Sequence, residues 1–301
     1  MTINKNTFFE LPKADVHNHF HLGGSQHKLL KKYPNAVITF PNTYDGLPGM
    51  IDFIYGHLNK IMVTKYDVIN FMEIAIESAI DDNVTLLEAS VDVGLSRFFD
   101  DSINDVISEV KRIKNKYKSQ IEFNPDIGIN KDLDIKKVYD YGEACIDSGI
   151  FSGIDIYGQE ANKDLKPFLK LFENAKKHNI KTKAHIGEFS DYKTINETIE
   201  LLNPDELQHG INAVASDKTM DLILEREIRL NICPTSNLAL GAVKSLKNHP
   251  MRKLFDKGIK FTINTDDLIL FDATVTDEFY KLYSENIFSF DELEVIRKNA
   301  F

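Results

Sequence analysis

The chain has 301 residues, 43% of them hydrophobic, and carries 36 basic against 46 acidic residues, a formal net charge of −10. This length and apolar content allow a large buried core. The negative charge argues against nucleic acid as a partner, because a phosphate backbone is bound by an excess of lysine and arginine. Two cysteines, Cys145 and Cys233, are too few for a disulfide framework, so we expect a cytoplasmic protein in a reducing compartment.

The first residues, MTINKNTFFELPK, contain no basic segment followed by a continuous apolar core. No later stretch approaches the roughly 20 apolar residues that a membrane span requires. We therefore expect no signal peptide, no anchor and no membrane partner.

The first predicted strand, ADVHNHF from residue 14 to residue 20, contains His17 and His19. Residues two apart on a strand point to the same face, so both imidazoles can bind one metal ion. A histidine cluster can equally be a solvated patch, and the pair by itself leaves metal binding open. His21 extends the cluster by two residues.

The interval from residue 21 to residue 84 is about twice the roughly thirty residues of a bare βα step. It contains a helical pattern in which the apolar residues recur at spacings of one, three and four: Val68, Ile69, Met72, Ile76 and Ile80. Residues 38–58 combine two prolines and several glycines with aromatic and aliphatic residues, which favours a lid over the carboxyl ends of the strands. The alternative is a helical hairpin packed on the side of the fold.

Seven further segments rich in apolar and β-branched residues follow, with helical stretches between them. They are residues 85–92, 121–129, 151–158, 181–188, 206–211, 229–236 and 260–267. Eight strands alternating with helices predict an α/β fold, a single (β/α)8 TIM-type barrel with an inserted helical lid after the first strand. No low-complexity linker interrupts the series, so we expect one domain over residues 1–301, with the lid insertion at about residues 23–82.

Active sites of such barrels lie at the carboxyl ends of the strands, and side chains capable of chemistry gather there in this sequence. Besides the first strand, the contributing residues are His185 and Glu188 of the fifth strand, His209 of the sixth, and Asp266 and Asp267 of the eighth. The predicted metal ligands are His17, His19, His185 and Asp266. Imidazoles with one carboxylate and no thiolate suit one zinc ion best, and other divalent transition metals remain candidates.

One coordination position is left for a water that the ion would acidify, which predicts a hydrolase. Asp266 is also a candidate to orient that water, and His209 to assist its deprotonation or to stabilise an oxyanion. Glu188 is a candidate proton donor, because enclosure beneath a lid would raise the pKa of its carboxyl group.

Structural interpretations of the same residues remain open. Glu188 can be a charge at the start of the following helix, His209 a core histidine, and Asp267 a helix cap. The other histidines lie in polar or helical contexts and are interpreted as surface residues: His27, His57, His178 and His249.

The motifs HNHFHLGGS, AHIGE, QHG, CPTSNLALGAV and NTDD occur in this order and together resemble the motif series of the adenosine deaminase family in the amidohydrolase superfamily. The resemblance extends from Lys13 to about Phe279. It implies a mononuclear zinc barrel that hydrolyses the exocyclic amine of an aminopurine and releases ammonia.

By matched position, the resemblance also implies the roles of individual residues. Glu188 would protonate ring N1, and His209 would stabilise and help to activate the attacking hydroxide at C6. Gly158 would contact the purine ring through its backbone, and Asp267 would hydrogen-bond to N7.

The chain departs from the family pattern in three places. His21 stands where an aspartate is common, which puts recognition of the ribose 5′-hydroxyl in question; it is either a cation facing a phosphate or carboxylate, or a polar wall residue. Ser90 stands where many relatives have an arginine, two residues after Glu88, and we expect altered packing below the site. The closing helices are expected to be short or absent.

A binuclear centre is not expected, because residues 151–158 contain no lysine for carboxylation, and Lys183 lies inside the fifth predicted strand. The leading hypothesis is a zinc-dependent hydrolytic deaminase that converts adenosine or deoxyadenosine to inosine or deoxyinosine. The nearest alternative is a deaminase of adenine, or of a modified or N6-substituted adenosine or adenylate. More distant alternatives are a non-purine amidohydrolase and a non-catalytic binding protein.

Overall fold

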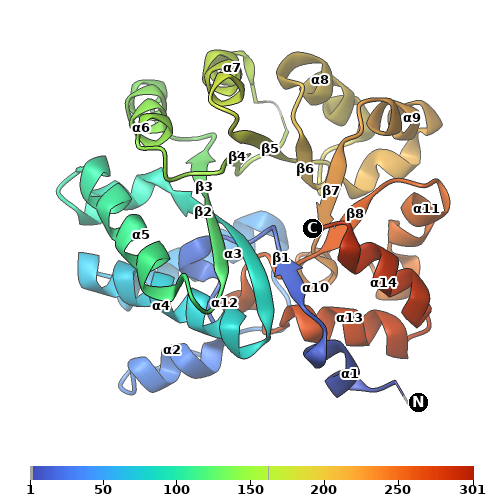
Figure 1. Ribbon diagram of the computed structural model, residues 1–301, viewed down its shortest axis with the longest axis horizontal. Helices are drawn as coiled ribbons and strands as arrows, with labels where there is room; N and C mark the ends of the chain where they lie inside the picture. The colour runs from blue at the N-terminus through green and yellow to red at the C-terminus, as the bar shows by residue number, and fades with distance from the viewer. Residues whose placement is uncertain (1–2, 162) are drawn as a thin grey trace.

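Eight parallel strands follow one another around a nearly closed barrel in the computed structural model, which describes residues 3–161 and 163–301 (Figure 1). The strands are β1 (Lys13–Asp15), β2 (Val84–Asp92), β3 (Glu122–Asn130), β4 (Gly153–Tyr157), β5 (Lys181–Ile186), β6 (Glu206–His209), β7 (Arg229–Ile232) and β8 (Phe261–Ile263). Each strand pairs with the next one in the chain, and an isolated bridge between Asn18 and Asp266 links the segments that follow β1 and β8. The predicted (β/α)8 barrel is confirmed.

Helices surround the strands (Figure 1). They are α1 (Lys5–Glu10), α2 (Gln26–Lys32), α3 (Gly46–Gly56), α4 (Lys65–Asp81), α5 (Ile103–Tyr117), α6 (Ile135–Asp147), α7 (Leu169–Lys177), α8 (Tyr192–Leu202), α9 (Asp217–Glu225), α10 (Pro234–Ala239), α11 (Met251–Asp256), α12 (Leu268–Phe271), α13 (Val275–Ser284) and α14 (Phe290–Lys298). Short 3-10 helices also occur, at Phe20–Leu22, Leu58–Lys60, Val93–Phe98, Lys166–Phe168, Ile211–Ala215 and Leu246–Asn248.

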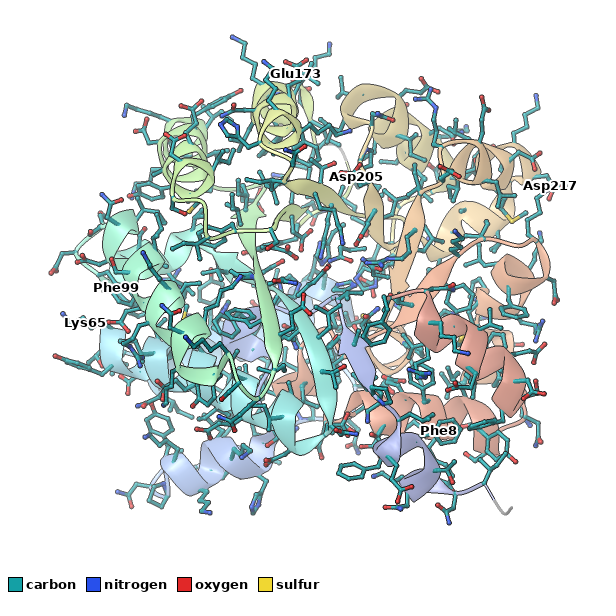
Figure 2. The ribbon with its side chains drawn as sticks, in the orientation of Figure 1. Phe8, Lys65, Phe99, Glu173, Asp205 and Asp217 are labelled. Carbon is teal, nitrogen blue, oxygen red and sulfur yellow. The ribbon has the colours of Figure 1, made fainter. Side chains whose placement is uncertain are left out.

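Amphipathic patterns explain how these helices pack. In α5, Val106, Val110 and Ile113 recur every three or four residues and are fully buried, and the Ser102 side chain caps the helix by accepting from the Asp105 backbone N–H. Figure 2 shows side chains filling the space between the strands and the helices. Two closing helices, α13 and α14, follow β8, with 10 and 9 residues. Among the described residues, no helix is both long enough and apolar enough to cross a membrane.

The first strand is shorter than predicted, because it ends at Asp15 rather than continuing to residue 20. Beyond Asp15, the Val16 backbone N–H donates to the side-chain oxygen of Asn264 at 2.9 Å instead of to a neighbouring strand. His19 makes only an isolated bridge with Ser90. The histidine-rich segment is therefore an irregular extension of β1 across the end of the barrel.

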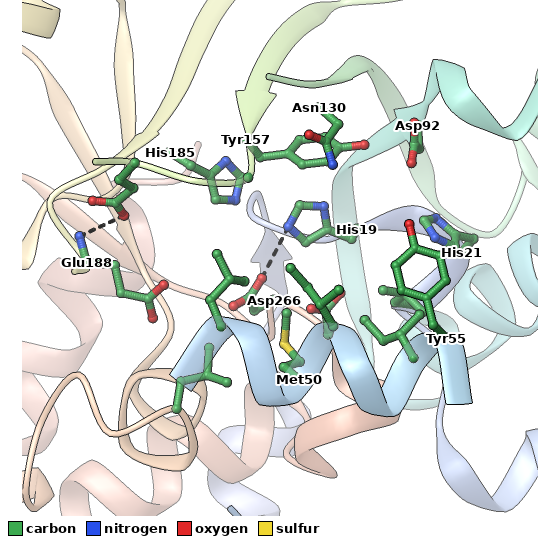
Figure 3. Close-up of a pocket in the computed structure, with 18 of the residues that line it drawn as sticks. His19, His21, Met50, Tyr55, Asp92, Asn130, Tyr157, His185, Glu188 and Asp266 are labelled. Carbon is green, nitrogen blue, oxygen red and sulfur yellow. Dashed lines mark hydrogen bonds and ion pairs between the residues drawn. The ribbon is translucent and has the colours of Figure 1, made fainter. Parts of the chain in front are cut away.

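The long interval after β1 contains α2, α3 and α4. Helix α4 packs on the barrel through the predicted positions Val68, Met72 and Ile76, which are fully buried, whereas Ile69 and Ile80 are only partly buried. Helix α3 has a single buried residue, Met50, and crosses the carboxyl ends of the strands instead of packing along the side of the barrel (Figure 3).

A network of buried charges occupies the barrel interior. Lys183 on β5 is fully buried, and its Nζ lies 2.6 Å from Glu88 Oε2 and 2.7 Å from Asp126 Oδ2. Burial opposes the lysine charge, but Asp126 and Glu88 together raise the pKa of Lys183 above its usual value. Lys183 from β5 thus provides a cation for Glu88 in a chain that has Ser90 where many relatives have an arginine.

The Lys183→Met substitution tests this network. It removes the cation that pairs with buried Asp126, whereas Glu88 keeps Lys181 Nζ at 3.0 Å from its Oε1, so we expect the free energy of unfolding to fall by about 3–5 kcal/mol, measured by urea denaturation. Lys136→Met is the control, because the Lys136–Asp140 pair is exposed and should leave the unfolding midpoint unchanged. Equal midpoints for the two variants would contradict a stabilising role for the Lys183 cation.

Candidate active site

Four side chains at the carboxyl ends of β1, β5 and β8 point their donor atoms at one another. The donor atoms of His17, His19, His185 and Asp266 all lie within 4.8 Å of one another. The Nε2 atoms of His17 and His185 are 3.0 Å apart, and Asp266 Oδ1 lies 3.4 Å from His17 Nε2 and 3.5 Å from His19 Nε2. Ligand atoms around a tetrahedral zinc are about 3.3 Å apart, given metal–ligand bonds of about 2.0–2.1 Å. The donor set therefore fits one zinc-sized ion.

Two imidazoles are held in the orientation that a metal ligand needs. Nδ1 of His17 donates to the Asn231 carbonyl oxygen at 2.8 Å, and Nδ1 of His185 donates to Asp155 Oδ1 at 3.0 Å. Burial opposes ionisation of Asp155, but its contact with His185 holds the pKa of the Asp155 carboxyl well below its usual range. With Nδ1 protonated, each Nε2 presents a lone pair to the cluster.

Ser90 takes part in this orientation, because its hydroxyl donates to Asp155 Oδ2. The expectation that Ser90 mainly alters packing below the site is therefore incomplete. It touches the carboxylate that orients His185, and its backbone N–H donates to the Asn18 carbonyl at 2.7 Å.

Two of the side chains at this end lie on strained backbone. His209 ends β6 with φ of 68°, and Asp266 follows β8 with φ of 62°, both in the left-handed region that is costly for residues with a Cβ. Two backbone hydrogen bonds stabilise the left-handed conformation of Asp266. The Asp266 N–H donates to the His17 carbonyl, and the His19 N–H donates to the Asp266 carbonyl. These bonds lock the β1 and β8 contributions together.

The loop that carries Glu188 is fixed from two sides. The buried carboxylate of Glu160 accepts from the backbone N–H groups of Gly187 at 2.8 Å, Glu188 at 3.1 Å and Ser190 at 2.9 Å. On the other side, Asn212 Nδ2 donates to the Glu188 carbonyl at 3.0 Å. A dashed line at Glu188 in Figure 3 marks one of these contacts.

Glu188 does not begin a helix, because α8 starts at Tyr192 with Asp191 as its cap. Its buried side chain instead turns toward the cluster, where Asn237 Nδ2 donates to Oε1 at 2.6 Å and His209 Nε2 lies 3.4 Å from Oε2. Burial, followed by the nearby charges of Asp266 and Glu160, raises the pKa of Glu188 well above its usual value. Burial therefore favours the protonated acid.

His209 is also buried, and it contacts side chains rather than a backbone carbonyl. Asn237 Nδ2 donates to its Nδ1 at 3.1 Å, and its Nε2 lies 4.0 Å from Asp266 Oδ2. Burial and the neighbouring His17 lower the pKa of His209 well below its usual value. Burial thus favours the neutral imidazole.

A second set of donor atoms overlaps the first. His17, His209, Cys233 and Asp266 also lie within 4.8 Å of one another. Burial and the nearby Asp266 raise the pKa of the Cys233 thiol well above its usual value, and a protonated thiol is a poor metal ligand. The set made of His17, His19, His185 and Asp266 is the better metal centre.

A cavity opens directly onto this cluster, with about 1040 Å³ of empty space including its open mouth. Its apolar wall comes largely from α3, including Leu47, Met50 and Ile54, and Phe189 and Leu240 also contribute to it. Figure 3 shows α3 running beneath His19 and Asp266, so the inserted segment covers the cluster.

The end of the cavity around His21 is lined by polar groups. Besides His21 these are Asp92, Asn130 and Tyr157 (Figure 3). His21 Nδ1 and the Tyr157 hydroxyl are buried without a hydrogen-bond partner in the described part of the chain. Burial, with smaller effects of His19 and Arg97, lowers the pKa of His21 to about 3. A neutral polar wall residue is therefore favoured over a cation.

Gly158 and Asp267 also line the cavity. Gly158 has φ of 96°, and a Cβ there would lie 3.0 Å from Asn130 Oδ1, so glycine keeps the backbone accessible. Asp267 precedes α12 but makes no side-chain capping bond, and its buried Oδ1 has no partner among the residues that the structure describes. Burial and the adjacent Asp266 raise the pKa of Asp267 well above its usual value.

The interpretation of His249 as a surface residue is wrong. Its exposure is 4%, its Nε2 lies 3.1 Å from Asn237 Oδ1, and the Met251 backbone N–H donates to its Nδ1 at 3.1 Å. The short turn before α11 directs the ring inward, which local polarity does not reveal. His27, His57 and His178 are exposed as predicted.

Helix α10 contributes two site residues that the sequence analysis did not assign. Ser236 donates its hydroxyl to Asp266 Oδ2 at 2.6 Å, and Asn237 contacts both Glu188 and His209. Both belong to the CPTSN motif, which the sequence analysis used only as part of the resemblance to a known family. That motif was the sequence signal that could have identified Ser236 and Asn237 as site residues.

Comparisons with known proteins agree with this geometry. The family model described as adenosine deaminase matches residues 12–301. A putative adenosine/adenine deaminase from Treponema pallidum is 35% identical over 274 residues, covering 91% of this chain and 91% of the relative.

Two solved structures share the fold. The apo structure of an N6-methyl-AMP deaminase from Arabidopsis thaliana has a TM-score of 0.84 and 17% identity, covering 99% of this chain and 93% of that one. An amidohydrolase from Burkholderia ambifaria with bound Zn has a TM-score of 0.81 and 19% identity, covering 99% and 88%.

The buried, neutral His249 predicts a specific acid sensitivity. Burial lowers its folded-state pKa from 6.5 to about 3, so below pH 6.5 the unfolded chain binds a proton that the folded chain does not. The stability contributed by the neutral ring is complete above pH 6.5 and is lost as the pH falls toward 3.

In His249→Gln, the free energy of unfolding of the metal-free protein should therefore fall less steeply with acidification. Between pH 6 and pH 4 the slope should be smaller than in the wild type by up to about 1.4 kcal/mol per pH unit, measured by urea denaturation. His178→Gln, at an exposed site, should keep the wild-type slope. An unchanged slope in His249→Gln would contradict a buried neutral ring.

Proposed function

The chain belongs to the adenosine deaminase family and is a hydrolytic deaminase, and from that premise we propose that it deaminates an aminopurine nucleoside, adenosine or deoxyadenosine. The observation that carries the proposal is a buried glutamic acid, with its pKa raised, beside a cluster of three histidines and an aspartate. Hydrolytic deamination of a purine needs these two things together: a nucleophile made from water and an acid that protonates the ring.

The residues proposed to hold one zinc ion are His17, His19, His185 and Asp266. The spacing of their donor atoms and the absence of thiolate support zinc, and other divalent transition metals remain candidates. When bound, the ion lowers the pKa of a coordinated water toward 7 and so makes a nucleophile available at neutral pH.

Glu188 is proposed to act as the general acid. Addition of an oxygen at C6 moves the C6–N1 π electrons onto N1, and the proton of Glu188 neutralises the charge that develops there. The hydroxyl proton of the tetrahedral adduct then passes to the amine nitrogen, the C6–N bond breaks as the C6=O bond forms, and ammonia leaves. The proton released when water becomes the nucleophile restores the acid form of Glu188. Enclosure of Glu188 in the cavity that α3 lines favours its protonated form.

The neighbouring groups are proposed to orient and stabilise the reacting atoms. Neutral His209 lies between Glu188 and Asp266, where it can hydrogen-bond to the oxygen that adds at C6. Asp266, besides binding metal, can accept a hydrogen bond from the attacking water. Asp267, whose raised pKa favours the protonated acid, can donate to purine N7, and the backbone at Gly158 can approach the ring closely.

The polar end of the cavity supports a nucleoside as the substrate. The side chains of Asp92 and Asn130 and the unpartnered Tyr157 hydroxyl are suited to sugar hydroxyls, and His21 is a neutral member of the same wall. Arg97 also lines the cavity but is exposed, and the Asp92 carboxylate would repel a phosphate. Free adenine would leave these groups unpaired. Adenine and an N6-substituted adenylate remain the alternatives, because similar proteins bear those names.

A substrate panel tests the proposed function. Zinc-loaded protein is assayed with adenosine, deoxyadenosine, adenine, AMP and N6-methyl-AMP by ultraviolet absorbance and ammonia release. We expect kcat/KM for the two nucleosides to exceed that for the other three by at least tenfold, since only the nucleosides pair the polar groups without introducing a phosphate. Chelation should abolish turnover and added zinc should restore it.

Other results of the panel have definite meanings. Preference for adenine or for a nucleotide would replace the nucleoside with that alternative. No turnover of any aminopurine by metal-loaded protein would overturn the deamination proposal.

The Glu188→Gln substitution tests the proton donor. The amide keeps the shape of the side chain but cannot supply the proton to N1, so we expect kcat to fall by roughly 10²–10⁴-fold with metal content unchanged. Glu197→Gln, an exposed change on α8, is the matched control and should keep wild-type kcat. Retention of kcat within tenfold in Glu188→Gln would exclude Glu188 as the required acid.

A further inference from the structure

Behind the proposed catalytic pair, Asn237 and His249 connect the backbone of α11 to Glu188 and His209. We propose that these two residues form a directional hydrogen-bond chain that determines which oxygen of Glu188 and which nitrogen of His209 carry the catalytic protons. The catalytic consequence rests on the proposed function, whereas the direction of the chain is a property of the fold alone.

The direction is set by a donor that cannot be reversed. The Met251 backbone N–H donates to His249 Nδ1 at 3.1 Å, so that nitrogen must present its lone pair. Burial lowers the pKa of His249 to about 3, so its ring is neutral and its single proton lies on Nε2. Nε2 is 3.1 Å from Asn237 Oδ1, to which it donates.

This contact settles the orientation of the Asn237 amide. With Oδ1 accepting from His249, the two hydrogens of Nδ2 face the other way. They point to Glu188 Oε1 at 2.6 Å and to His209 Nδ1 at 3.1 Å. Asn237 is completely buried, so no solvent replaces either bond.

The chain therefore assigns one proton on each catalytic group. His209 Nδ1 accepts a hydrogen bond, so the proton of the neutral ring lies on Nε2, the nitrogen that faces Glu188 Oε2 and Asp266 Oδ2. Glu188 Oε1 also accepts, so the acid proton belongs on Oε2. In this state His209 donates a hydrogen bond toward the reacting oxygen and does not remove a proton from it.

Asn237 and His249 are positioning residues, because neither lines the cavity. They act by biasing tautomer and amide orientation. Loss of the His249 donor would allow the Asn237 amide to turn over and present its oxygen to two acceptors, which would misplace both protons.

The first test observes the tautomers directly by ¹⁵N NMR of the imidazole nitrogens in zinc-loaded protein, with the His209 signals assigned by their loss in His209→Gln. We expect His209 and His249 to carry their protons on Nε2. In Asn237→Asp, an isosteric change that replaces the donors with a carboxylate, His209 should shift its proton to Nδ1. A wild-type His209 protonated on Nδ1, or a tautomer unchanged in Asn237→Asp, would overturn the proposal.

The second test separates positioning from packing by kinetics. His249→Leu should lower kcat at least tenfold with KM within threefold and with zinc content unchanged. His249→Gln, whose amide can still donate to Asn237, should recover most of that loss. The exposed His27→Leu is the matched control and should retain wild-type kcat.

Asn237→Asp should lower kcat at least a hundredfold. Because this change is isosteric, it tests the hydrogen-bond chain even if His249→Leu does not fold. Two results would overturn the proposed hydrogen-bond chain. One is an equal loss of kcat in His249→Leu and His249→Gln, and the other is a kcat within twofold of wild type in both His249→Leu and Asn237→Asp. If the wild type turns over no aminopurine, the proposed function fails, while the NMR result still decides the direction of the chain.

Discussion

The close approach of three imidazoles and one carboxylate at the end of the barrel is the constraint on which the rest of the site depends. Donor atoms 3.0–3.5 Å apart are spaced so that each can present a lone pair to one shared cation. The barrel makes the approach possible because the carboxyl ends of parallel strands converge there. The surrounding contacts direct the Nε2 atoms of His17 and His185 inward. The Asn231 carbonyl and the Asp155 carboxylate both do this by accepting from Nδ1.

A second set of contacts places the two proposed catalytic groups, Glu188 and His209, beside this cluster. Burial shifts the pKa values of these two groups in opposite directions. It raises the pKa of the Glu188 acid and lowers the pKa of the His209 base, so it favours the neutral form of both. Neutral groups at such close range depend on hydrogen-bond direction rather than on charge attraction. This explains why the loop that carries Glu188 is held by Glu160 and Asn212, and why a single amide, Asn237, contacts both neutral groups.

The barrel interior contains charged groups that remain ionised because they form ion pairs with one another. Lys183 is fully buried between Glu88 and Asp126 and lies on the strand that ends in His185. The chain thus combines a cation from β5 with a serine on β2, and that serine hydroxyl is used to hold Asp155. Side chains two residues apart on one strand therefore pair buried charges at position 183 and contribute a donor atom to the candidate metal centre at position 185.

The sequence by itself determined the barrel and most of the side chains at its functional end. Alternating apolar strands and amphipathic helices are local patterns, and the carboxyl end of each strand is where its apolar run stops, so His185, His209 and Asp266 were recognisable without coordinates. Only the tertiary structure decided how long β1 is, because a side chain from beyond β8, Asn264, takes the Val16 N–H. Only the tertiary structure turned His249 inward and gave Ser236 and Asn237 their partners, because these contacts join residues 12 to 49 positions apart. Local periodicity carries no information about such contacts. The direction of a hydrogen bond depends on which donor and acceptor meet, and that is known only when the chain has folded.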